Sequence, residues 1–292
     1  MLPRFGYLRP ATLGEALRAL DDYAGEARLL AGGTDLLISM KDGLARPKYV
    51  IDIKQIPELR TLRVTGGSGL TIGACVTVNE LLAFGALPAG MTALREAASW
   101  LGTHQVRHRA TVGGNLCNAS PACDLAPPLL VLDATVKALS AKGERAIPLK
   151  DFMTCPKETC LARHELVTEI VVPPADGTRS GFAKRTRIRG HDLSVVNAAV
   201  ALSVDGVSGG RSGPRGKQAA RLRIALGAVA PTPLLVEGLD GLDPGDEAGV
   251  MKVILGAISP IDDVRGSGLY RKAMVRVLIG DLLKRLREGG SK

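Results

Sequence analysis

Two glycine pairs, about 80 residues apart, are the residues of this chain with the clearest potential for binding chemistry. The first pair lies in the segment Ala31-Gly32-Gly33-Thr34-Asp35-Leu36. The second lies in the segment Thr111-Val112-Gly113-Gly114-Asn115-Leu116. Because glycine has no Cβ, such segments can turn successive backbone N–H groups toward a phosphate. Two of them could hold the two phosphates of a dinucleotide from different sides. Two ordinary tight turns would explain the same residues, and the segments alone leave both interpretations open.

The usual nucleotide-binding fingerprints are absent from the sequence. No G-x-G-x-x-G run follows a predicted strand, which disfavours a Rossmann dinucleotide site. The pair Gly216-Lys217 lacks the first glycine and the following hydroxyl residue of a P-loop. A dinucleotide would therefore need a different kind of fold.

Histidines and cysteines offer weaker signals of a metal site. His104 and His108 stand four residues apart, a spacing that can hold zinc on a helix, but Gln105 occupies the place of the usual glutamate and no third ligand is evident. We therefore expect no zinc there. Four of the five cysteines form two pairs, which leaves an iron–sulfur cluster as a minor alternative, at Cys117, Cys123, Cys155 and Cys160. Their spacings match no common ligand run, and free cysteines often only pack.

The elements that must position these residues follow from periodicity and turn signals. Helices are predicted at residues 12–23, 78–84, 91–101, 125–132, 247–258 and 268–286. Strands are predicted at 27–31, 49–53, 134–139, 181–187, 195–202 and 222–229, with a hairpin joining 62–64 to 70–72. Residues 102–128 are predicted to form a long ligand loop, and residues 206–217 a flexible hairpin tip. This order indicates an α/β unit first and an antiparallel sheet with helices last.

Composition bounds the class of protein. The chain has 292 residues, 46% of them hydrophobic, which suffices for a substantial core in about two domains. Its net charge of +9 with only 3% aromatic residues favours a solvated or subunit-facing basic surface over nucleic-acid binding, including the local cluster Lys184, Arg185, Arg187 and Arg189. No signal peptide or run of 18 apolar residues is visible, so we expect a cytoplasmic protein with no membrane span.

Several motifs in order give the sequence a specific resemblance. Residues 31–36 and 110–124 resemble the flavin-binding medium subunit of the xanthine dehydrogenase and carbon monoxide dehydrogenase family of molybdenum hydroxylases. The similarity runs the length of the chain, with further matching motifs at residues 5–10, 181–185, 225–233, 263–267 and 270–272.

The resemblance implies an α+β fold. Residues 1–174 would form a two-subdomain FAD-binding domain of the PCMH/VAO-like type, divided near residue 58 into 1–58 and 59–174. Residues 178–292 would form a small C-terminal domain with a three-stranded antiparallel sheet and helices.

The resemblance also assigns an FAD site. Backbone N–H groups of Gly32 to Asp35 would hold the pyrophosphate on one side. Thr111, Gly114, Asn118 and Ser120 would hold it on the other. Asp124 would bind the ribose or adenosine half. Leu166 and Lys184 would lie near the flavin ring, where a lysine could favour reduced, anionic flavin. The full set implied to bind FAD is Leu30, Ala31, Gly32, Gly33, Thr34, Asp35, Leu36, Thr111, Gly113, Gly114, Asn118, Ser120, Asp124, Leu166 and Lys184.

The implied activity is electron transfer. A large molybdopterin-binding subunit would oxidise the substrate, and a small subunit with two [2Fe–2S] clusters would pass electrons to the FAD of this chain. From there they would reach NAD⁺, a quinone or another acceptor, within a dimer of heterotrimers. No residue here would act as a catalytic acid or base. A self-contained FAD oxidoreductase, or an FAD-fold binding or assembly protein, are the alternatives.

One departure from the family pattern keeps the cluster alternative open. Family members usually have a glycine-rich turn where this chain has residues 154–160, which include Cys155 and Cys160. A relative, 4-hydroxybenzoyl-CoA reductase, carries an additional [4Fe–4S] cluster on an insertion that this chain lacks.

Overall fold

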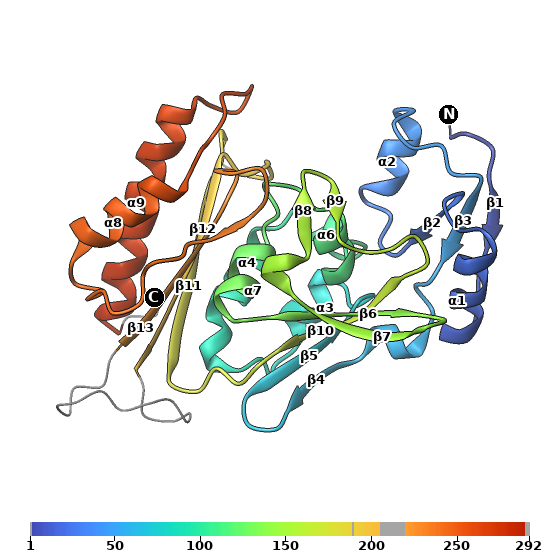
Figure 1. Cartoon of the computed structure of the whole chain (residues 1–292), viewed down its shortest axis with the longest axis horizontal. Helices are drawn as coiled ribbons and strands as arrows, with labels where there is room; N and C mark the ends of the chain where they lie inside the picture. Colours follow the sequence, from blue (N-terminus) through green and yellow to red (C-terminus); the bar gives the residue numbers. More distant parts are fainter. Residues whose placement is uncertain (1, 189, 205–219, 290–292) are drawn as a thin grey trace.

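The computed structural model of the chain describes residues 2–188, 190–204 and 220–289. Arg189 and the predicted hairpin tip at residues 206–217 lie outside the described residues. Three larger sheets follow one another along the molecule in sequence order, a two-stranded sheet accompanies the middle one, and helices pack around them (Figure 1). Among the described residues, no helix combines the length and the apolar character needed to cross a membrane.

The first unit is a small parallel sheet with two helices. Its elements are β1 (Gly6–Leu8), α1 (Leu13–Asp22), β2 (Ala27–Leu30), α2 (Leu36–Lys41) and β3 (Tyr49–Asp52), and the strand order is β1-β3-β2. Helix α1 begins after Thr12, whose side chain accepts the N–H of Glu15, and its apolar face buries Ala16 and Leu20 against Ile51. The predicted α/β unit is therefore found, with β1 as a strand that was not predicted.

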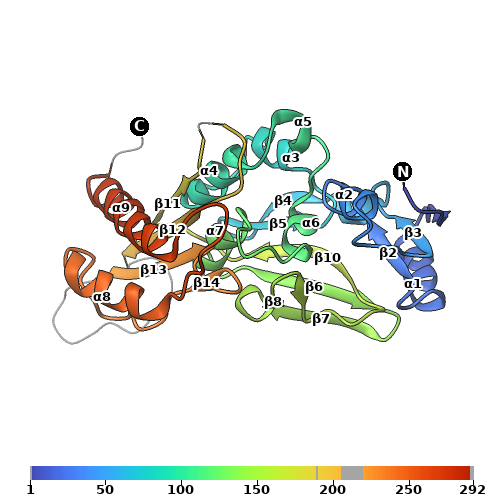
Figure 2. The same ribbon diagram turned by 90° about the horizontal axis from the view of Figure 1, so that it is seen from above.

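The middle unit is built on a five-stranded antiparallel sheet of order β4-β5-β10-β6-β7 (Figure 2). Its strands are β4 (Leu62–Thr65), β5 (Gly69–Gly73), β6 (Thr135–Ser140), β7 (Gly143–Pro148) and β10 (Leu166–Val172), with a separate hairpin of β8 (Met153–Cys155) and β9 (Glu158–Thr159). Its helices are α3 (Val78–Ala83), α4 (Thr92–Trp100), α5 (His104–Arg107), α6 (Val112–Cys117) and α7 (Ala126–Val131). Short 3₁₀ turns lie at Pro57–Arg60, Ala89–Met91 and Leu149–Asp151.

The prediction of one long loop at residues 102–128 was wrong. This stretch contains α5, α6 and the start of α7. Thr103 and Thr111 cap α5 and α6 with their side chains. Helices of four and six residues are too short to show a periodic apolar pattern, which explains why the sequence reads as irregular.

The C-terminal unit is a four-stranded antiparallel sheet covered by helices on both faces. Its elements are β11 (Thr178–Arg185), β12 (Val196–Val204), β13 (Ala220–Gly227), β14 (Leu234–Leu235), α8 (Glu247–Ala257) and α9 (Gly268–Arg287). Along β12, Val196, Ala198 and Val200 pack toward α8 and α9, whereas Ala199 and Ala201 face the core of the middle unit. The expected three-stranded sheet is thus corrected to four, because the two-residue β14 also pairs with β13.

A buried arginine fastens the start of α9 to this sheet. Arg271 is 1% exposed and donates to the carbonyls of Val195 and Ala228 and to the carboxylate of Asp263, at 2.6, 3.0 and 2.6 Å. Asp263 also receives two hydrogen bonds from the guanidinium of Arg265. This pairing with Arg265 holds the pKa of Asp263 down at about 2.

A pH-dependent contribution to stability follows from Asp263. Because its pKa falls on folding from 3.8 to about 2, its stabilisation is complete above pH 4 and disappears as the pH falls toward 2. We expect Asp263→Asn to lower the free energy of unfolding by about 2 kcal/mol at pH 7, with the deficit shrinking below pH 4. Urea unfolding across pH 2–7 measures this. Asp151→Asn is the control, since Asp151 is an exposed aspartate in the turn that follows β7. A deficit that stays constant down to pH 2 would contradict the assignment.

Candidate functional site

The first glycine segment forms an open row of backbone donors at the end of the parallel sheet. It joins β2 to α2, and Gly33 adopts φ +77°, a left-handed conformation that glycine tolerates without strain. The N–H groups of Gly32, Gly33, Thr34 and Asp35 donate to no acceptor among the described residues. Unpaired backbone donors in a turn form an anion-binding concavity. The segment is partly exposed, so a phosphate can reach it.

The first segment lies directly against the chain that precedes Thr111. A Cβ on Gly32 would collide with the carbonyl oxygen of Arg109 and lie 2.7 Å from its carbonyl carbon, so only glycine permits this approach. Across the same junction, the side-chain amide of Asn118 donates to Asp35 at 2.8 Å. The two glycine segments, distant in sequence, therefore meet in space as the phosphate-binding interpretation requires.

The second glycine segment is a helix rather than a loop. Thr111 is buried and caps α6 by accepting the N–H of Gly114 at 3.0 Å. The N–H groups of Val112 and Gly113 donate to the carbonyls of Val76 and Ala74. In this structure the first turn of α6 therefore has its donors occupied, unlike the first segment. The roles predicted for Thr111, Gly113 and Gly114 toward a phosphate stay predictions.

Gly113 has a packing reason to be glycine. A Cβ at this position would lie 2.7–2.8 Å from three atoms of Ala74, so the helix can approach the end of β5 only without a side chain. This contact sets α6 against the five-stranded sheet. It also fixes the place of Asn118, which ends α6 and reaches Asp35.

A cavity of about 650 Å³ borders the junction of the two segments. Its walls come from the ends of β3 and β5 and from α3 and α5, and they carry Lys54, Arg60, Cys75, Thr77, Asn79, Glu80, His104, Arg107, His108, Arg109 and Thr111. Sequence reasoning missed Arg109 and this cavity, because its polar residues come from several elements and connections that only the tertiary fold brings together. Its volume is in the range of small-ligand sites.

The two histidines of the cavity wall contact each other. The Nε2 atoms of His104 and His108 are 3.1 Å apart, and their rings meet edge to face. Among the described residues, no three His, Cys, Asp or Glu side chains are gathered as a metal site would need.

The cysteines are also not gathered into a metal site among the described residues. Cys123 and Cys75 are buried, and burial raises the pKa of each thiol to about 12, which disfavours the thiolate that ligates metals. Cys117 and Cys155 are exposed. The minor alternative of a cluster on Cys117, Cys123, Cys155 and Cys160, all described residues, gains no support.

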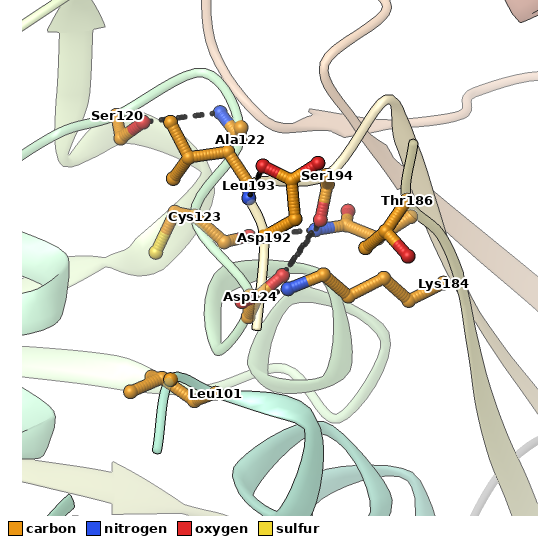
Figure 3. Close-up of polar contacts among 12 residues, drawn as sticks. Leu101, Ser120, Ala122, Cys123, Asp124, Lys184, Thr186, Asp192, Leu193 and Ser194 are labelled. Atoms are coloured by element: carbon orange, nitrogen blue, oxygen red, sulfur yellow. Dashed lines mark hydrogen bonds and ion pairs between the residues drawn. The ribbon is translucent and has the colours of Figure 1, made fainter. Parts of the chain in front are cut away.

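Asp124 and Lys184 form a buried ion pair between the middle and C-terminal units (Figure 3). The Lys184 ammonium donates to Asp124 Oδ2 at 2.7 Å, and its side chain is 2% exposed. Asp124 Oδ1 also accepts from Ser194 at 2.8 Å and from Asn197 at 3.0 Å. The carboxylate predicted to bind a sugar thus already has three protein donors, and its role toward the cofactor remains a prediction.

The other predicted residues are more dispersed. Ser120 accepts the N–H of Ala122, two residues before Asp124. Leu166 in β10 is fully buried in the core around Ile51 and Cys75. Its side chain offers no exposed surface in this structure, and its contact with a flavin also stays a prediction. Leu30 is buried and Ala31 and Leu36 are half-buried around the first segment.

Two further members of the basic cluster, Arg185 and Arg187, are engaged within the chain. Arg187 pairs with Asp192 at 3.0 Å, and this pairing holds the pKa of Asp192 down at about 2. Arg185 donates to the hydroxyl of Tyr270 at 3.1 Å.

Comparison with known proteins agrees with this geometry. The family model for the FAD binding domain in molybdopterin dehydrogenase matches residues 3–175, and that for the CO dehydrogenase flavoprotein C-terminal domain matches residues 182–286. The chain therefore belongs to the FAD-binding medium subunits of the molybdenum hydroxylase family, and it is a subunit of an FAD-dependent oxidoreductase.

Individual relatives match over almost their whole length. The carbon monoxide dehydrogenase medium chain of Hydrogenophaga pseudoflava is 34% identical, covering 97% of this chain and 96% of the relative. The glyceraldehyde dehydrogenase medium chain of Sulfolobus acidocaldarius is 30% identical, covering 94% and 96%. Among solved structures, carbon monoxide dehydrogenase from Hydrogenophaga pseudoflava, in a form lacking the Mo-pyranopterin moiety, superposes with a TM-score of 0.88 at 30% identity and full coverage of both chains. Relatives named for carbon monoxide and for glyceraldehyde both match over nearly the whole chain, so membership of the family does not specify a substrate.

Proposed function

We propose that this chain binds FAD with the diphosphate on the open N–H row of Gly32 to Asp35. The carrying observation is that four successive backbone donors have no acceptor among the described residues, at the place where the two glycine segments meet. A diphosphate supplies the negative charge and the acceptors that such a row lacks. We assign the adjoining cavity, with Arg109 and Thr111 in its wall, to part of the same dinucleotide.

The proposed role is electron transfer within a complex. Bound FAD would supply the redox chemistry, and the protein would position it and set its electrostatic surroundings. Electrons would come from [2Fe–2S] clusters of a small partner subunit, after substrate oxidation on a large molybdopterin subunit, and would leave to NAD⁺, a quinone or another acceptor. The subunit names of the relatives support this arrangement, and we extend it to a dimer of heterotrimers. We also propose that the chain divides functionally at residues 174–178, between the two family matches.

Absorbance spectroscopy of the purified complex tests the proposal. Flavin bands that remain with this chain after the subunits are separated, with no iron, are the expected result. A colourless chain that takes up no added FAD would favour an assembly role. An active chain that purifies without partner subunits would favour a self-contained oxidoreductase.

The buried Lys184 gives a prediction for the flavin potential. If its ammonium lies near the flavin ring, it stabilises anionic reduced flavin, so Lys184→Met should lower the two-electron midpoint potential. Each tenfold loss of that preference corresponds to about 30 mV. Spectroelectrochemistry at saturating FAD makes the measurement, with Lys150→Met, a change of an exposed lysine, as control. An unchanged potential would remove Lys184 from the flavin environment.

A further inference from the structure

A hairpin tip that played no part in the predicted site reaches the junction of the two glycine segments. The tip between β8 and β9 carries Lys157, whose backbone N–H donates to the carbonyl of Ala119 at 2.8 Å. Its ammonium donates to Asn118 Oδ1 at 3.0 Å. The same Asn118 amide donates to Asp35 at 2.8 Å. A continuous chain of side chains therefore links the tip to the end of the N–H row.

The charges around the row explain what this chain of contacts provides. Asp35 closes the row with a negative charge, which by itself opposes the approach of a diphosphate. Lys157 brings a positive charge one amide away from that carboxylate. At the other end of the row, the backbone of Arg109 touches Gly32 while Arg109 lines the cavity. Cationic residues thus stand at both ends of the four donors.

The Lys157 ammonium can exchange its hydrogen bond to Asn118 for one to a phosphate. The contact with Asn118 is a hydrogen bond to a neutral amide at an exposed position. A hydrogen bond between an ammonium and a phosphate oxygen is charge-assisted and stronger. The flexible four-carbon stem of lysine lets the ammonium move without moving the backbone.

The backbone of the tip is strained at Lys157, a position that glycine would occupy more easily. Lys157 adopts φ +69°, and its partner Ala119 adopts φ +43°, so two residues other than glycine occupy the left-handed region at one contact. Glycine would fill the Lys157 position without strain. Strain of this kind concentrates where a side chain has a function.

We propose that Lys157 is a further FAD-binding residue, whose ammonium reaches from the hairpin tip to the diphosphate on the N–H row and supplies a positive charge to it. The proposal rests on the proposed function, since it takes the row as the diphosphate site. It adds a third element to the two glycine segments and gives the departure at residues 154–160 a role in binding.

The test compares FAD and ADP binding by isothermal titration calorimetry in variants of the flavin-free complex, at several salt concentrations. Lys157→Met should weaken FAD and ADP alike by roughly fivefold at low salt, the effect of one partly exposed charge, and should flatten the salt dependence. Lys157→Arg should stay close to the wild type. Lys142→Met, at the exposed tip between β6 and β7, is the matched control and should change neither affinity.

A fourth variant separates binding from folding. Lys157→Gly should raise the melting temperature of the ligand-free protein by relieving strain, yet weaken FAD binding as Lys157→Met does. If Lys157→Met bound FAD and ADP each as tightly as the wild type does, the assignment of Lys157 would be overturned while the FAD site itself would stand. Weakened FAD binding with unchanged ADP binding would overturn the contact with the diphosphate. A wild type that binds neither probe would reject the FAD site itself, and Lys157 with it.

Discussion

Replacing Gly32 by alanine is expected to weaken FAD binding by roughly a hundredfold, the loss produced when two charge-assisted hydrogen bonds of about 1.5 kcal/mol each are broken. The added Cβ would collide with the backbone carbonyl of Arg109. Backbone atoms cannot rotate away as a side chain can, so the two glycine segments must separate. The N–H row would then no longer face the same ligand as the second segment.

Stability should fall less than binding does. Overpacking at one tight contact costs about 1–3 kcal/mol, and the segment lies at the partly exposed end of the sheet. Fluorescence titration of the flavin-free variant with FAD measures the affinity, and urea unfolding measures the stability. Gly85→Ala is the control, because Gly85 is exposed and a Cβ there meets no atom within 4 Å. An affinity within fivefold of the wild type would show that the approach of Gly32 to Arg109 does not shape the site.

The contrast between the two glycine segments shows what the sequence could predict. A glycine pair at the end of a short apolar run is a local signal, and the first segment forms the predicted open turn after β2. The second pair has the same letters but a capping residue, Thr111, placed three residues before Gly114. That spacing is the sequence signal of a helix start, and it takes up donors that a loop would leave free. Two similar glycine pairs therefore differ in their backbone N–H groups, which have no acceptor among the described residues in the first segment and are hydrogen-bonded in the second.

The contacts that sequence reasoning failed to predict join residues far apart in the sequence. Asp124 and Lys184 were predicted as separate contacts of a cofactor, whereas the fold makes them partners 60 residues apart. No residue near Asp124 in the sequence indicates that its carboxylate will pair with Lys184, Ser194 and Asn197. By contrast, α9 and β12 were predicted closely, because their patterns are long enough to average over single residues.

The same pair provides the prediction with the largest expected effect on stability. Asp124→Asn keeps the shape of the side chain but leaves the Lys184 ammonium, 2% exposed, without a counter-charge. Removing one member of a buried pair costs about 3–5 kcal/mol, because the remaining charge is neither solvated nor paired. Lys184→Met should cost less, since Asp124 keeps the donors Ser194 and Asn197.

A double-mutant cycle separates charge from packing. Asp124→Asn combined with Lys184→Met removes both charges, so its free energy of unfolding should lie above that of Asp124→Asn alone. Glu26→Gln is the control: it breaks the exposed pair with Lys48 and should leave urea unfolding unchanged. Additive losses in the double variant would mean that the two side chains act independently. A recovery, in contrast, would identify the pair as the electrostatic link between the middle unit and the C-terminal sheet, on which the placement of Lys184 depends.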